Sequence, residues 1–163
     1  MKPKSPRLAA RALILQDNAL LLVNAFPDGR SDLWCAPGGG VESGASLHDN
    51  LMREVHEETG IDACHPSCHL QDWQLENVYD IYPAWRWRYH PEVSRNTERV
   101  FGLRLPQKMP ITLSPSEHTE YRWLPWLQAA DEVFSPSNAE AILMLPRQIA
   151  LRWGTSQSPA GPT

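Results

Sequence analysis

Residues 39–61 constrain the fold of this chain more than any other segment, because a glycine-rich stretch there leads into a strongly marked helix. The consecutive glycines at 38–40 indicate backbone with unusual dihedral angles, or backbone that another group approaches closely. A helix is predicted over 46–59, with Ser46 as its N-cap and Gly60 as its terminating residue. The apolar stripe of this helix should pack on a core, and it comprises Leu47, Leu51, Met52 and Val55.

A group of glutamates lies on one flank of this predicted helix. Glu54 precedes Glu57 by three residues and Glu58 by four, so the side chains project from neighbouring helical positions. Glu58 also falls near the side that should face the core, where an unpaired carboxylate is costly to bury. A divalent cation would neutralise the group, and Mg²⁺ fits carboxylate oxygens best. The alternative is a solvated acidic flank without a metal.

The residues Gly39, Arg53-Glu54-Val55, Glu57-Glu58 and Gly60-Ile61 together resemble the signature of the Nudix hydrolases, which act on nucleoside diphosphates linked to another group. The resemblance implies an α/β/α sandwich, dependence on Mg²⁺ or Mn²⁺, and attack of water on a pyrophosphate phosphorus. It implies that Glu54, Glu57 and Glu58 are metal ligands and that Arg53 orients Glu54. Gly39 would shape the loop on the substrate side.

One position departs from this signature. The family has a glutamate six residues after the first glycine, and Ala45 stands there in this chain. The resemblance implies that the missing glutamate supports the loop and the metal site less directly than the later glutamates. Glu42 is a candidate replacement from the same loop.

A basic and aromatic stretch at 86–99 contrasts with the acidic helix. Such a contrast suits a polyphosphate substrate that a metal bridges to the carboxylates, while arginines bind the remaining charge. The candidate substrate-binding residues here are Arg86, Arg88, Arg95 and Asn96. The alternative is a sheet with exposed basic residues and buried tryptophans.

The string from Arg86 to Glu98 is similar to that of the Nudix branch that converts 7,8-dihydroneopterin triphosphate into the monophosphate and pyrophosphate in folate biosynthesis. Further matches are Glu117-His118, Tyr121-x-Trp123-Leu124 and Ser137-Asn138. Two alternatives stay open. One is a broad hydrolase of ordinary or oxidised deoxynucleoside triphosphates, and the other is a nucleotide-sensing module without catalysis, which Ala45 favours.

Glu117 lies in a loop before a predicted strand. By the family resemblance it is a further metal ligand or the base that deprotonates water, and its alternative is a surface acid. The adjacent His118 is interpreted as a structural residue or as one that forms hydrogen bonds within the loop.

The remaining pattern predicts an α/β (α+β) fold with a mixed β-sheet and a loop-helix-loop motif. A hairpin is expected from strands at 9–15 and 20–23, with a turn at Asp17-Asn18. Further strands are expected at 70–90, 98–105 and 121–124, followed by a closing helix at 137–153 that Pro146 should kink or split. The predicted domain covers 8–153, between a loose leader at 1–7 and a disordered tail at 154–163.

Composition excludes several classes of protein. The chain of 163 residues has a formal net charge of −4, which argues against a dedicated nucleic-acid binder. It contains no apolar run of the ~20 residues that a membrane helix needs. Its 3 cysteines, an odd count, suit reduced thiols in the cytoplasm. We expect the protein to be a monomer or a homodimer and to bind a small-molecule triphosphate as its substrate.

Overall fold

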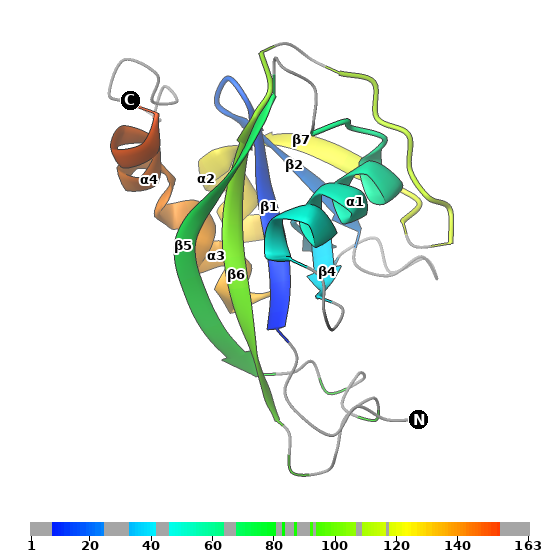
Figure 1. The fold of residues 1–163 in the computed structure, drawn as a ribbon, viewed down its shortest axis with the longest axis vertical. Coiled ribbons are helices and arrows are strands. Elements are labelled where there is room, and N and C mark those ends of the chain that lie inside the picture. The colour runs from blue at the N-terminus through cyan, green and yellow to red at the C-terminus, as the bar shows by residue number, and fades with distance from the viewer. Residues whose placement is uncertain are drawn as a thin grey trace.

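The computed structural model describes residues 8–24, 33–41, 46–63, 68–80, 83, 87, 92, 94–106, 109–116 and 118–153. Within these residues the chain forms one mixed sheet covered by helices on both faces (Figure 1). The strands are β1 (Leu8–Gln16), β2 (Ala19–Asn24), β3 (Trp34–Cys35), β4 (Gly38–Gly40), β5 (His69–Asp80), β6 (Arg95–Arg104) and β7 (Tyr121–Pro125).

The sheet has the order β3-β2-β1-β6-β5, with β4 paired to β1 and β7 paired to β2. The pairing of β1 with β6 is parallel, whereas the other pairings between strands are antiparallel. The parallel pair requires a long crossover, and that crossover carries the helix α1 (Leu47–Thr59). The predicted mixed α/β sheet is therefore confirmed.

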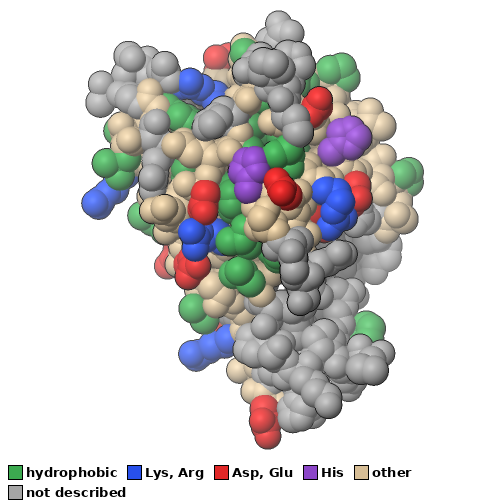
Figure 2. Space-filling model, in the orientation of Figure 1, with side chains coloured by type: hydrophobic (Ala, Val, Ile, Leu, Met, Phe, Trp, Pro, Cys, Tyr) green, Lys and Arg blue, Asp and Glu red, His purple; other side chains and the backbone are tan. Residues whose placement is uncertain are grey.

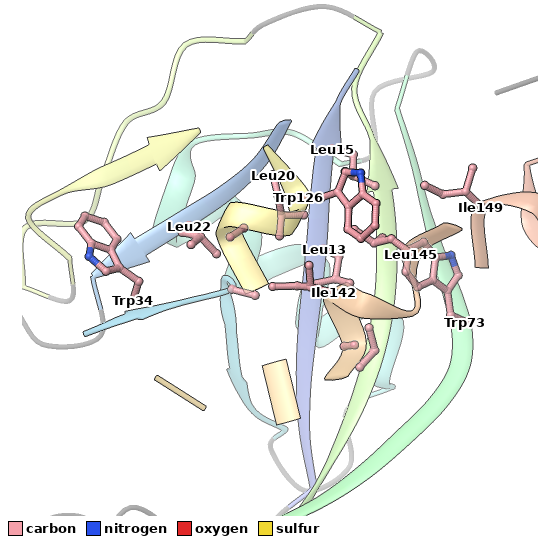
Figure 3. Close-up of a cluster of buried hydrophobic side chains, with 14 residues drawn as sticks. Leu13, Leu15, Leu20, Leu22, Trp34, Trp73, Trp126, Ile142, Leu145 and Ile149 are labelled. Carbon is pink, nitrogen blue, oxygen red and sulfur yellow. The ribbon is translucent and has the colours of Figure 1, made fainter. Parts of the chain in front are cut away.

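Two hydrophobic cores lie on opposite faces of β1, because alternate residues of a strand point to opposite sides. Ala12 and Ile14 face the core beneath α1, together with Leu51 and Val55 of that helix. Leu13 and Leu15 face the other core, which α2 (Trp126–Glu132), α3 (Pro136–Leu143) and α4 (Leu145–Arg152) cover. Figure 3 shows this second core, where the side chains of Trp126, Ile142 and Leu145 gather against the sheet. The predicted α/β/α sandwich is confirmed.

Several expected elements appear with shifted ends. The hairpin of β1 and β2 turns at Asp17, whose φ of 55° is the left-handed conformation of a tight turn. The strand expected at 70–90 is described from His69 to Asp80, and the residues that follow are described only in part. The closing helix is split at Met144, with Pro146 in the first turn of the second half. This outcome confirms the expected effect of Pro146.

The helix α2 was not predicted. It follows β7 directly, and its seven residues are too few to show a helical periodicity of apolar residues. The predicted leader and tail lie outside the described residues, so the domain boundaries remain predictions. None of the described helices is long and apolar enough to cross a membrane.

Candidate active site

The helix α1 carries the acidic group and is held at both ends. The Ser46 hydroxyl accepts a hydrogen bond from the Asp49 amide at 3.1 Å, as the sequence predicted. Gly60 adopts a left-handed conformation with φ of 77° and donates its amide to the His56 carbonyl at 2.8 Å. Because both ends are fixed and Leu51 and Val55 are fully buried, the polar flank of α1 has a defined orientation.

Glu58 is the buried member of the group, with only 3% of its surface exposed. Its Oε2 accepts a hydrogen bond from the Gly38 amide at 2.9 Å, and its Oε1 lies 2.6 Å from Nε2 of His118. Gly38 has a φ of 139°, and a Cβ there would overlap the Ala10 carbonyl oxygen. Only glycine therefore lets this backbone approach β1 while it donates to Glu58. The expectation that Glu58 faces the core agrees with this placement.

Glu54 and Glu57 share the guanidinium of Arg53. Nη1 of Arg53 donates to both carboxylate oxygens of Glu57 at 3.1 Å, and Nη2 lies 3.7 Å from Oε1 of Glu54. Nη2 also donates to Oδ1 of Asn50 at 3.0 Å. The two carboxylates therefore lie around one positive charge, while Glu58 turns toward Gly38 and His118.

Gly39 lies directly against the Glu54 carboxylate. A Cβ added to Gly39 would stand 3.8 Å from both carboxylate oxygens, which is ordinary van der Waals contact. The glycine-rich strand β4 thus passes over the acidic flank, and a side chain larger than alanine at residue 39 would crowd it. Figure 2 shows acidic, basic and histidine side chains side by side over α1.

The loop before β7 is held by Asn24, which the sequence analysis missed. Its carbonyl oxygen lies 2.6 Å from Nδ1 of His118, and its side chain bonds to Thr119 and Glu120. Asn24 and His118 are separated by 94 positions in the chain. No local pattern could have paired them, although the expectation that His118 forms hydrogen bonds was correct.

The candidate substrate residues are placed only in part. Arg95 lies at the end of β6, exposed, with Nε 3.2 Å from Oδ1 of Asp80 on the paired strand. Asn96 beside it is buried. The assignments to Arg86, Arg88, Glu117, Ala45 and Glu42 fall outside the described residues.

Glu98 joins the basic string to the glycine-rich strand. This buried carboxylate accepts hydrogen bonds from Nε of Arg11 at 3.2 Å, Oγ of Ser137 at 2.8 Å and Nδ2 of Asn138 at 3.1 Å. Arg11 also donates to the Ala36 and Gly38 carbonyls. Two motifs far apart in the sequence therefore form one network that supports the backbone contacting Glu58.

The local environment beneath the site is poorly solvated. Burial raises the pKa of the Cys35 thiol to about 11; the positive charge of Arg11 opposes this shift, and the negative charges of Glu58 and Glu98 add to it. The shift follows from the burial of Cys35, whose surface is only 6% exposed.

The donor set suits a hard divalent cation, since it offers carboxylate oxygens from one helical flank. Glu54 and Glu57 already surround a cationic group, so a metal there would replace the contact with Arg53. Within the described ranges, no three acidic, histidine or cysteine side chains converge on one point. Glu117, the further candidate ligand, is not among those ranges.

Comparisons with known proteins show what this chain is similar to. The NUDIX domain profile matches residues 5–145. The chain is 40% identical over 111 residues to the dihydroneopterin triphosphate diphosphatase of Escherichia coli K12, covering 68% of this chain and 73% of that protein. It is 29% identical over 125 residues to the Haemophilus influenzae enzyme of the same name, covering 77% of each. The solved structure of the E. coli dihydroneopterin triphosphate pyrophosphohydrolase superposes with a TM-score of 0.77 at 33% identity, covering 87% of this chain and 95% of that one.

Proposed function

The chain belongs to the NUDIX domain family and is a Nudix pyrophosphohydrolase, and we propose that its substrate is 7,8-dihydroneopterin triphosphate. The products are the monophosphate and inorganic pyrophosphate, formed in folate biosynthesis. The observation that carries this proposal is the 40% identity to the E. coli dihydroneopterin triphosphate diphosphatase. The network around Glu98 supports it, because that network contains residues of both stretches that resemble this branch.

The glutamates of the acidic flank have two roles in the proposed reaction, metal binding and acceptance of a proton. Glu54, Glu57 and Glu58 would hold Mg²⁺ or Mn²⁺, with Glu117 joining them. The cation, when bound, makes water more acidic and neutralises charge on phosphate oxygens. One of the glutamates accepts the proton of the attacking water, since a carboxylate within hydrogen-bond reach is a competent base.

The remaining residues hold the substrate and its leaving group. Arg86, Arg88 and Arg95 bind the negative charge of the departing pyrophosphate, and Asn96 contributes a polar contact. Gly39 keeps the backbone close to Glu54, so that a phosphate chain can reach the acidic flank without steric obstruction. Arg53 orients Glu54 and Glu57.

The proposal is tested by measuring pyrophosphate release from a panel of substrates. The panel holds 7,8-dihydroneopterin triphosphate, the four deoxynucleoside triphosphates and an oxidised deoxyguanosine triphosphate, each with Mg²⁺, with Mn²⁺ and with EDTA. We expect the pterin substrate to have the highest kcat/KM and EDTA to abolish release. A higher kcat/KM for deoxynucleotides would favour the broad hydrolase, and binding without hydrolysis would favour the sensor.

A further inference from the structure

A buried chain of hydrogen bonds joins the end of β2, the loop before β7, the acidic helix and the glycine-rich strand. It runs from the Asn24 carbonyl to His118, from His118 to Glu58, and from Glu58 to the Gly38 amide, with separations of 2.6, 2.6 and 2.9 Å. Asn24, His118 and Glu58 are each at most 7% exposed. Such short bonds, shielded from water, fix the geometry of the groups that they connect.

The chemistry of the acceptors orders the imidazole. The Asn24 carbonyl oxygen can only accept, so Nδ1 of His118 donates to it. Nε2 is therefore the atom that faces Oε1 of Glu58, at 2.6 Å. With Oε2 receiving the Gly38 amide, both oxygens of Glu58 are held and its carboxylate has one orientation.

The ring of His118 is itself held from the opposite side of the site. Asn24 is 1% exposed, and its Oδ1 accepts the amides of Thr119 and Glu120 at 3.0 and 3.1 Å. Its Nδ2 donates to the Thr119 hydroxyl at 2.8 Å. These bonds hold the backbone next to His118 through Asn24 of β2, which is not part of α1.

We propose that His118 is a positioning residue that holds the Glu58 carboxylate in the orientation needed to bind the divalent cation. This inference rests on the proposed function, since it assumes that Glu58 is a metal ligand. Glu57 supplies the contrast: its carboxylate is 49% exposed, and its hydrogen bonds described above come from the side chain of Arg53 on the same helix. A residue such as His118, which forms a hydrogen bond to a metal ligand, raises the metal affinity by orienting that ligand.

Two substitutions separate the two bonds of His118. Asparagine places its amide near Nδ1 and retains the bond to Asn24, but it does not reach Glu58. Glutamine places its amide near Nε2 and can still donate to Glu58. We expect His118→Asn to lower both kcat and Mn²⁺ affinity by about 10- to 100-fold with little change in KM. We expect His118→Gln to recover most of both losses.

The decisive measurement is a titration of Mn²⁺ against the substrate-free protein, followed by electron paramagnetic resonance, with thermal unfolding of each variant. His48→Asn is the matched control, because His48 also bonds to a backbone carbonyl, that of Leu70, but lies on the first turn of α1. We expect His48→Asn to bind Mn²⁺ as the wild type does.

Two outcomes would overturn the proposal. One is a folded His118→Asn variant with wild-type Mn²⁺ affinity and kcat. The other is an equal loss in the asparagine and glutamine variants that follows their loss of thermal stability, which would make the role of His118 purely structural. If the wild type ignores dihydroneopterin triphosphate but His118→Asn still weakens Mn²⁺ binding relative to glutamine, the proposed substrate fails and the role of His118 stands.

Discussion

At the scale of single residues, the three glutamates of the acidic flank differ in their burial and in their neighbours. Glu58 is buried against His118 and Gly38, Glu54 lies under Gly39, and Glu57 is half exposed beside Arg53. Identical side chains three or four positions apart therefore differ in solvation and in freedom to move. The effects of substitution should differ accordingly, with stability and activity separable at Glu57.

Glu57→Gln should remove activity without removing stability. The change deletes one charged oxygen donor, so we expect kcat to fall by at least about 100-fold. Because the side chain is 49% exposed, the free energy of unfolding should change by less than about 0.5 kcal/mol. Steady-state kinetics and urea unfolding measure the two quantities. Glu140→Gln, on the exposed side of α3, is the control, and activity of Glu57→Gln within a few-fold of the wild type would remove Glu57 from the metal site.

Cys35 should make the protein less stable at high pH. Its pKa is raised from 9.0 to about 11 in the folded state, so the unfolded thiol ionises first as the pH rises. The unfolded state then binds fewer protons than the folded state, and the stability present below pH 9 is lost as the pH rises toward 11. We expect a loss of about 1 kcal/mol between pH 8 and pH 10.

Comparison with Cys35→Ala isolates this contribution from those of other groups that titrate in the same range. Urea unfolding of both proteins at the two pH values gives the change in the free energy of unfolding with pH for each, and the difference between the two changes is the contribution of Cys35. Equal pH dependence in the two proteins would show that Cys35 is not shielded as described.

At the scale of elements, α1 positions the site because its two ends are fixed by short-range interactions. Ser46 begins the helix by accepting the Asp49 amide with its hydroxyl, and Gly60 ends it in a left-handed conformation that its missing Cβ permits. The C-terminal end matters more for the site, since Glu57 and Glu58 lie in the last turn. A substitution at Gly60 therefore tests how the C-terminal end of α1 is held.

Gly60→Ala should destabilise the protein by about 1–2 kcal/mol, because an L-residue is strained at a left-handed φ. The φ is 77°, and the added Cβ would stand 3.1 Å from Cβ of Thr112, so the loop that follows β6 must shift. Ser46→Ala should cost about 1 kcal/mol through loss of the cap. Chemical denaturation compares the two, and a Gly60→Ala midpoint equal to that of the wild type would contradict the strained geometry.

At the scale of the whole molecule, Glu98 connects parts of the chain that are far apart in sequence. It lies on β6, bonds to Arg11 on β1 across 87 positions, and bonds to Ser137 and Asn138 at the start of α3. Asn138 in turn accepts the Ala36 amide at 2.9 Å. The stability of the sandwich and the placement of the glycine-rich strand therefore depend on one buried carboxylate.

Glu98→Gln should lower the free energy of unfolding by about 3 kcal/mol, because it removes the negative charge from a buried carboxylate that pairs with the part-buried Arg11. Glu76→Gln is a matched control: Glu76 also contacts an arginine, Arg99 at 2.7 Å, but its side chain is 48% exposed. The exposed pair should contribute less than about 1 kcal/mol. Equal losses in the two variants, measured by urea unfolding, would argue against a special role for the buried network.

Local patterns were sufficient for much of the fold. The hairpin of β1 and β2, the helix α1 with both of its caps, and the split at Pro146 all depend on interactions within a few residues, so their chemistry is readable in order along the chain. The short helix α2 and the strands β3 and β4 were missed, because their few residues carry too little periodicity.

The sequence by itself predicted the acidic helix and placed Glu58 near its core-facing side, because both follow from spacing along one helix, and its motifs resemble those of the Nudix family. Only the tertiary structure decided the partners of that helix. His118 and Gly38 reach Glu58 from two other parts of the chain, and Asn24 holds His118 from a third. Glu98 bonds to Arg11 across 87 positions and to Asn138 on the other side. Such contacts depend on which strands become neighbours, and the strand order is set by the packing of the whole sheet rather than by any local pattern.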